Sequence, residues 1–159
     1  MVLDIKSIPN LLFERSKIDN VGIGSKSNSE IWNCAGINFI PLNTDTDTFR
    51  AESGARIADA GLGEMFLFAN VTLPDRAVIS EVKVFGEVQS GTVDWHLFRI
   101  LLGDTVGEEQ TEMAAAALNT SDKTISNNLV DNENYSYYLR ADKLEDGDAI
   151  VGAWIKYTV

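Results

Sequence analysis

The fold class is decided by the stretch Ala77-Val78-Ile79-Ser80-Glu81-Val82-Lys83-Val84-Phe85-Gly86-Glu87-Val88. In an extended strand, successive side chains point to opposite faces. One face of this stretch would then carry Val78, Ser80, Val82 and Val84, and the other Ile79, Glu81, Lys83 and Phe85. Valines on one face, against two charges on the other, predict a β-strand with one buried face and one wetter face.

Further short strands are expected along most of the chain, separated by polar turns such as Asp131-Asn132-Glu133-Asn134. The predicted strands are residues 37–40 (ended by Pro41), 63–73, 77–88, 93–102, 124–130, 135–140 and 149–159. About eight strands, with no room for helices between them, are typical of an all-β fold. We therefore predict an antiparallel β-sandwich that is jelly-roll-like.

Two of these strands have a clear face, and one neighbouring segment stays open. The last strand would place Val151, Ala153, Ile155 and Tyr157 on one face, and residues 135–140 would do the same with Tyr135, Tyr137 and Leu139. Residues 108–118 contain an alanine run that favours a short helix but also fits an irregular strand on a tight sheet face. Both alternatives are kept for that segment.

The first 30 residues differ from the rest because polar and small residues interrupt short apolar pieces. We therefore expect an N-terminal arm over residues 1–30 and a β-sandwich domain over residues 31–159. The arm would either pack on a neighbouring subunit or form a loose tail. Its candidate assembly residues are the apolar Ile8, Leu11, Leu12 and Phe13.

The charge of the chain argues against two classes of partner. With 24 acidic and 13 basic residues, the formal net charge is −11. Such a charge repels nucleic acid phosphates and anionic membranes, whereas it suits a protein with a basic face. The opening residues do not form a signal peptide, and no apolar run approaches the roughly 20 residues of a membrane span. Synthesis in the cytoplasm is therefore expected.

The residue types needed for catalysis are scarce. A catalytic triad needs a histidine base, and the single histidine, His96, lies inside an alternating strand on its less buried face. The single cysteine, Cys34, cannot form an intramolecular disulfide and is expected to be a small buried residue. One residue of each kind is too few for a zinc site. We predict no enzyme activity and no cofactor.

Two weaker ligand hypotheses remain. Asn43, Asp45 and Asp47 alternate as oxygen ligands do at the start of a calcium loop, although the glycine and the closing glutamate of an EF-hand are missing. The turn at residues 145–148 is a second possible contributor, and ordinary turn chemistry is the alternative for both. Among the aromatic residues, Trp95 and Trp154 are expected to pack on the sheets, which leaves Tyr138 as the best candidate for stacking against a ligand.

Residues 73–158 contain an ordered series of short motifs. They are Leu73-Pro74-Asp75-x-Ala77-x-Ile79, Trp95-x-Leu97-x-Arg99, Met113-Ala114, Thr124-Ile125, Val130-Asp131-Asn132-x-Asn134-Tyr135-Ser136-Tyr137-Tyr138-Leu139 and Gly152-x-x-Ile155-x-Tyr157-Thr158. The series resembles a β-sandwich module that recurs in phage tail and virion proteins and in bacterial surface or secreted proteins. The resemblance implies an architecture and a place at the exposed ends of assemblies, without shared catalytic residues.

The function predicted from these observations is structural. We expect a non-enzymatic phage virion protein at the virion surface, either a capsid decoration or cement protein or a short tail-fibre or spike head. It would act as a homo-oligomer, with a trimer expected, and would have other virion proteins such as the major capsid protein as partners. A carbohydrate-binding module is the alternative and needs exposed, coplanar aromatic rings. A hydrolase would need a cleft that holds two close carboxylates.

Overall fold

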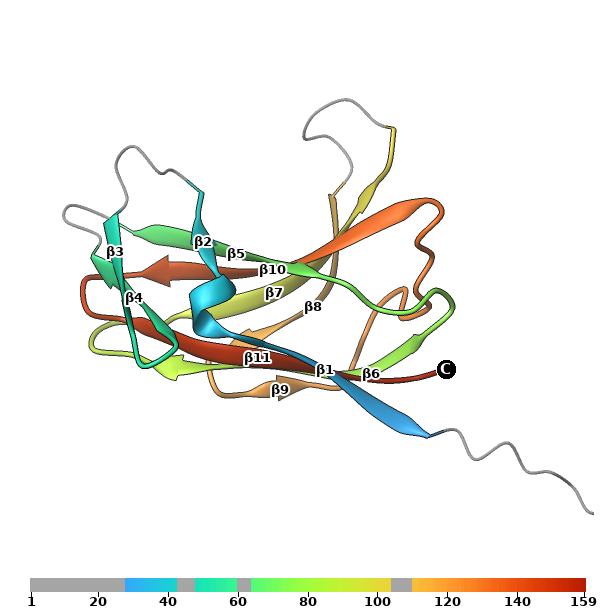
Figure 1. Ribbon diagram of the computed structural model, residues 1–159, viewed down its shortest axis with the longest axis horizontal. Helices are drawn as coiled ribbons and strands as arrows, with labels where there is room; N and C mark the ends of the chain where they lie inside the picture. The colour runs from blue at the N-terminus through green and yellow to red at the C-terminus, as the bar shows by residue number, and fades with distance from the viewer. Residues whose placement is uncertain (1–27, 43–47, 60–63, 104–109) are drawn as a thin grey trace, which may run out of the picture.

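The computed structural model describes residues 28–42, 48–59, 64–103 and 110–159, and within these ranges the chain is built almost entirely of β-strands (Figure 1). The elements are β1 (Ser29–Ala35), η2 (Gly36–Asn38, a turn of 3-10 helix), β2 (Ile40–Pro41), β3 (Thr48–Glu52), β4 (Ala55–Asp59), β5 (Met65–Val71), β6 (Val78–Glu87), β7 (Asp94–Leu101), β8 (Gln110–Ala117), β9 (Ser121–Asp122), β10 (Tyr135–Leu144) and β11 (Ala149–Thr158). The predicted all-β class is confirmed, with more and shorter strands than the eight expected.

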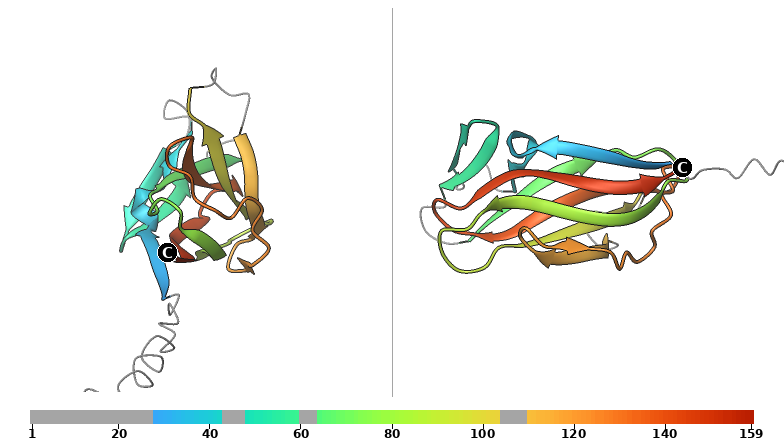
Figure 2. Two further views of the ribbon diagram at one scale, coloured as in Figure 1. Left: turned by 90° about the vertical axis from the view of Figure 1, so that its right-hand side faces the viewer. Right: turned by 90° about the horizontal axis from the view of Figure 1, so that it is seen from below.

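The strands form two antiparallel sheets that pack face to face as a sandwich (Figure 2). The six-stranded sheet has the order β3-β4-β11-β6-β9, and β1 pairs with β11 on the same side as β4. The five-stranded sheet has the order β2-β5-β10-β7-β8. Most connections from β5 onward pass from one sheet to the other, and β7 to β8 is the exception. The predicted antiparallel sandwich is therefore confirmed.

The core lies between the two sheets and is filled by the inward side chains of both. The largest fully buried side chains include Trp95, Phe39, Met65, Leu67, Ile79, Leu97, Met113, Leu139, Leu144, Ile150 and Ile155. The one polar group of the Trp95 side chain has a partner there, because its indole N–H donates to the Thr120 carbonyl at 3.0 Å. Burial of a large aliphatic or aromatic side chain stabilises a fold by about 1.5–3 kcal/mol, so this layer supplies the main stabilising term.

The deciding strand, β6, is present, but its faces differ from the predicted alternation. Lys156 of β11 pairs with Glu81, whereas the next residue, Tyr157, pairs with Ile79, so Ser80 is an extra residue in a β-bulge. The bulge moves Ile79 onto the buried face that carries the later valines of the strand, and leaves Val78 exposed. The prediction that Val78 shares the core face was therefore wrong, because a bulge resets the period of two.

A second bulge alters the predicted face of β11. Ile150 pairs with Gly86 and Gly152 with Phe85, so Val151 has no partner in this ladder. Val151 is 49% exposed, while Ile150 is fully buried in its place. The other members of the predicted face, Ala153, Ile155 and Tyr157, are buried as expected. Local alternation identified this strand but did not locate its irregular residue.

The open segment at residues 108–118 contains a strand. Residues 110–117 form β8, which pairs with β7, and Met113 is the extra residue of a bulge between Glu112 and Ala114. Met113 and Ala114 are both buried. Small alanine side chains allow this close packing at the sheet, which decides between the helix and the strand in favour of the strand.

Two predicted strands were wrong. Of residues 37–40, the first two belong to the 3-10 turn and only Ile40 belongs to a strand, the two-residue β2. A Cβ at Gly36 would lie 1.8 Å from the Ile150 carbonyl oxygen, so the chain turns where it touches β11. Residues 124–130 form no strand, apart from an isolated bridge at Leu129. Ser126 N–H donates to the Met113 carbonyl of β8 at 2.8 Å, whereas Asn128 and Val130 bond with Ile79 and Ala77 at the start of β6, so the segment divides its backbone bonds between two strands.

Candidate functional site

The outer face of the five-stranded sheet carries a row of aromatic rings, which we call the aromatic row: Phe68, Tyr138, Phe98 and His96. Register brings them together, since Tyr138 of β10 lies opposite Phe98 of β7. The rings of Phe98 and Tyr138 stack at 5.3 Å and 19°, those of His96 and Phe98 at 5.7 Å and 23°, and Phe68 lies 5.7 Å from Tyr138. Phe98 is only 6% exposed, although it points away from the core. The row is thus a second small apolar layer.

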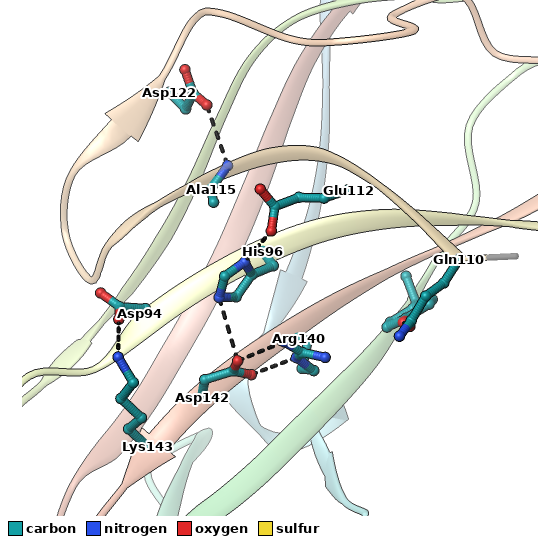
Figure 3. Close-up of polar contacts among 10 residues, drawn as sticks. Asp94, His96, Gln110, Glu112, Ala115, Asp122, Arg140, Asp142 and Lys143 are labelled. Atoms are coloured by element: carbon teal, nitrogen blue, oxygen red, sulfur yellow. Dashed lines mark hydrogen bonds and ion pairs between the residues drawn. The ribbon is translucent and has the colours of Figure 1, made fainter. Parts of the chain in front are cut away.

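A group of charged residues lies at one end of the aromatic row, and we call it the polar brace: His96, Glu112, Arg140 and Asp142 (Figure 3). His96 Nδ1 is 2.7 Å from Glu112 Oε2, and His96 Nε2 is 3.3 Å from Asp142 Oδ2. Arg140 donates to both oxygens of Asp142, at 2.6 and 2.7 Å. Three strands, β8, β7 and β10, are joined by these contacts.

Every side chain of the polar brace contacts another member through an ion pair or a hydrogen bond. Each nitrogen of the His96 imidazole faces a carboxylate, so both nitrogens are engaged within the polar brace. The bidentate Arg140 pair occupies both oxygens of Asp142, a residue that is 7% exposed. The Arg140 guanidinium also lies over the Phe98 ring, 4.7 Å from its centre. The arrangement stabilises the sheet, and His96 points outward as predicted.

Tyr138, the candidate for ligand stacking, lies in the middle of the aromatic row. Its ring has Phe98 on one side and Phe68 on the other, and its hydroxyl donates to the side-chain amide oxygen of Gln110. The side chain is half-buried, and burial raises the pKa of its hydroxyl. Tyr138 therefore packs against two rings of its own sheet and is only partly open to solvent. Its role in ligand binding stays a prediction.

The tryptophans occupy three different environments. Trp95 is fully buried, whereas Trp32 and Trp154 are half-buried on the six-stranded sheet. The ring of Trp154 lies 6.4 Å from that of Phe85, and the Lys156 ammonium lies 4.6 Å from the centre of the Trp154 ring. Trp95 and Trp154 therefore both pack on the sheets, as expected.

Several predicted site residues lie outside the described residues. They are the calcium candidates Asn43, Asp45 and Asp47 and the assembly candidates Ile8, Leu11, Leu12 and Phe13. The second acidic turn is described. Its Asp148 is fully buried, and the carboxylate accepts the backbone N–H of Gln89 at 2.7 Å and of Glu145 at 2.8 Å. Asp148 therefore satisfies the backbone of its own turn, and the described residues contain no group of three or more His, Cys, Asp or Glu side chains placed to hold a metal.

The most specific motif of the sequence has an architectural role. The Tyr137 hydroxyl accepts the Asp131 N–H at 2.8 Å, and the Asn132 side chain donates to the Leu73 carbonyl at 2.8 Å. The side chain of Asn134 donates to the Asp131 carboxylate at 2.8 Å and holds the pKa of that carboxyl below its usual range. These bonds join two loops at one end of the sandwich, which explains the residue types without invoking a ligand.

Cys34 lies on β1 with its side chain packed against the core. Burial raises the pKa of its thiol to about 11, and a hydrogen bond with the Ala153 backbone opposes this shift. The predicted small buried residue is therefore partly buried and protonated at neutral pH. Such a thiol is a poor nucleophile.

The sequence analysis did not identify the edge of the six-stranded sheet that β1 forms. Ile31 and Asn33 point outward there, and Ile31 is 56% exposed. Exposed apolar side chains gather in this part of the chain, since five of the twelve exposed large hydrophobic residues among those the structure describes lie in residues 31–42 and 48–49. They are Ile31, Ile37, Ile40, Leu42 and Phe49. The sequence signal was an apolar strand start directly after the arm.

Comparisons with known proteins add no further residue roles. Within the described residues, no helix is both long enough and apolar enough to cross a bilayer. The part of the resemblance that the structure bears out is the sandwich of two antiparallel sheets. No protein-family model matches the sequence, and no curated protein matches it significantly, so the chain is assigned to an architecture and not to a family.

Proposed function

We propose that this protein is a non-enzymatic structural protein of a phage virion that works by homo-oligomeric assembly. The observation that carries the proposal is the concentration of exposed apolar side chains on residues 31–42 and 48–49, in the first part of the described chain. Ile37 and Phe49 are linked there through Arg56, which donates to the Ile37 carbonyl and lies 3.8 Å from the centre of the Phe49 ring. The exposed Ile37 and Phe49 thus form one cluster around the buried Arg56, and an exposed apolar surface is a feature of protein–protein contact sites.

The polar brace supports the non-enzymatic part of the proposal. An acid–base catalyst needs a group free to exchange a proton with a substrate. The imidazole of His96 is engaged at both nitrogens, and the carboxylate of Asp142 at both oxygens. Catalysis by this group would require these contacts to open, which favours a structural role.

The place of the protein is proposed from the resemblance and the charge. A capsid decoration protein, or a short fibre or spike head, sits on the outside of a particle and meets other virion proteins. The net charge of −11 favours a partner with a basic face, such as a region of the major capsid protein. Co-sedimentation with purified capsids that weakens as salt rises would support this contact, whereas no binding at low salt would contradict it.

Size-exclusion chromatography with light scattering tests the assembly directly. The full chain at micromolar concentration is expected to elute with the mass of a homo-oligomer. A strict monomer at all concentrations would contradict the proposal. Circular dichroism of the same sample, with a β-sheet spectrum, would establish that the material measured is folded.

Glycan binding is the second candidate, and the aromatic row is the observation that favours it. Phe68, Tyr138 and Phe98 lie beside polar groups of Gln110 and Arg140 on the outer sheet face, where Phe68 and Tyr138 are half-buried and Phe98 is buried. A glycan array of the full chain tests this function. Signals that disappear in Tyr138→Ala but persist in Tyr135→Ala would support it, and an array without signals would end it.

A further inference from the structure

Strand β1 is an edge strand with one side unpaired. Its seven residues pair with β11 from Ser29↔Thr158 to Ala35↔Gly152, and no described element pairs with the opposite side (Figure 2). The strand contains no proline and no lysine, and Glu30 is its single charge. A long, regular edge without these features presents free backbone N–H and C=O groups that can pair with another strand.

The other edges of the two sheets are protected in the described residues. Strands β2 and β9 have two residues each. The edge of β8 is capped, because the Ala115 N–H donates to the Asp122 carboxylate at 3.3 Å and the Met113 carbonyl accepts the Ser126 N–H at 2.8 Å. Strand β3 carries both Arg50 and Glu52. Strand β1 is therefore the edge best suited to accept a partner strand.

The charge around β1 favours a second copy of the same chain as the occupant. Two chains of net charge −11 repel each other, so contact requires a region where acid does not face acid. Strands β1 and β11 together hold one acidic residue, Glu30, and one basic residue, Lys156. Glu30 accepts a hydrogen bond from the Tyr157 hydroxyl at 2.9 Å, and Lys156 lies 2.7 Å from Glu81. This strip is locally neutral in a strongly acidic protein.

We propose that β1 pairs antiparallel with β1 of a second copy across a two-fold axis at Trp32, which joins two six-stranded sheets into one continuous sheet. This pairing rests on the proposed assembly function and specifies the surface through which two copies would meet. Trp32 is the middle residue of β1, so this register pairs the whole strand. Ile31 then lies opposite Asn33 of the other copy, and Glu30 lies opposite Cys34, so no charge faces its own copy.

The side chains of β1 suit this register. Trp32 is half-buried against the core at the open edge, and it would meet its own copy as a cross-strand aromatic pair. Ile31, exposed in the single chain, would be covered by the second copy's strand. A contact between identical surfaces closes after two copies. The inference therefore predicts a dimer, or a larger particle with an even number of copies, in place of the expected trimer.

Cross-linking at the axis tests the register. The variant Trp32→Cys with Cys34→Ser has one cysteine, which faces its own copy in the proposed pairing. It is expected to form a covalent dimer on mild oxidation. The matched control is Ala35→Cys with Cys34→Ser, whose cysteine is exposed but lies opposite Ser29. Equal cross-linking in both variants, or none at residue 32, would overturn the register.

A lysine on the edge tests the contact without a cross-link, and it guards against loss of packing in the Trp32 variant. Ile31→Lys is expected to weaken dimerisation roughly tenfold or more, because an apolar side chain is no longer buried. Leu129→Lys is the control, since Leu129 is 54% exposed, compared with 56% for Ile31, and is bridged to Val78 of β6, from which β11 separates β1. Light scattering gives the masses, and circular dichroism checks the fold.

The outcomes separate this inference from the proposed function. A wild-type chain that stays monomeric contradicts both. An oligomer that Ile31→Lys leaves unchanged, or a strict trimer, contradicts the β1 pairing while assembly through another surface stands. A dimer lost in Ile31→Lys and kept in Leu129→Lys, with cross-linking at residue 32, supports both.

Discussion

The outer face of the five-stranded sheet and the β1 edge of the six-stranded sheet differ in whether their polar and apolar groups already contact a neighbour within the chain. On the outer face, His96 and Asp142 are held by charged neighbours, and Tyr138 lies between two rings. On the edge, β1 has an unpaired side and the exposed side chain of Ile31. The charged and aromatic side chains of the outer face are thus already paired with one another. The unpaired backbone edge of β1 therefore has more groups free for a partner.

The largest effect on this comparison is expected from Asp142→Ala. Removal of this carboxylate leaves the partly buried Arg140 and His96 without their shared partner, and loss of one member of a buried pair typically costs about 3–5 kcal/mol. Urea unfolding measures the change in the free energy of unfolding. If the outer face is structural, the oligomer mass of the folded variant stays that of the wild type.

The control for Asp142→Ala is Asp94→Ala, which removes an acid of the same sheet. Asp94 contacts Lys143 at 2.7 Å, and the two side chains are 33% and 49% exposed. An exposed pair contributes little to stability because solvent screens it, so this variant is expected to unfold close to the wild type. Equal losses for the two variants would contradict the structural role given to the polar brace.

The next effect concerns the reactivity of Cys34, which measures how well the core-facing side of β1 is covered. Burial raises the pKa of this thiol from 9.0 to about 11, so at pH 8 the thiolate fraction is about 100-fold lower than in the unfolded chain. Alkylation by iodoacetamide is expected to slow by that factor in the folded protein, and to accelerate as the pH rises toward 11. Equal rates in native and urea-unfolded protein at pH 8 would show that this side of β1 is open.

The smallest effect is expected from His96→Gln. Glutamine keeps a donor but not a second one on the opposite side, so one of the contacts with Glu112 and Asp142 is lost. We expect a loss of roughly 1–2 kcal/mol in the free energy of unfolding, with unchanged oligomer mass. A change of oligomeric state would instead place the outer face in the assembly contact and reverse the comparison.

Much of the fold could be predicted from local pattern, and little of the candidate site could. Residues 135–140 and 149–159 alternate, and both are strands with the buried side chains Tyr137, Leu139 and Ile155. Residues 124–130 also contain apolar residues, but their backbone bonds are divided between β8 and the start of β6, so no continuous strand forms. The meeting of His96 with Glu112 depends on the register of β7 against β8, to which the bulge at Met113 contributes.

From the sequence alone we could predict the longer strands such as β6, β7, β10 and β11, several of the turns between them and the scarcity of catalytic residue types. These are local properties, since alternation, turn residues and composition are read from neighbours in the chain. Only the tertiary structure decided which strands carry bulges, as at Ser80 and Val151, and which side chains meet across them. Bulges and edges arise from pairing between residues far apart in the chain. The position of β1 at an open edge is therefore a property of the folded sheet.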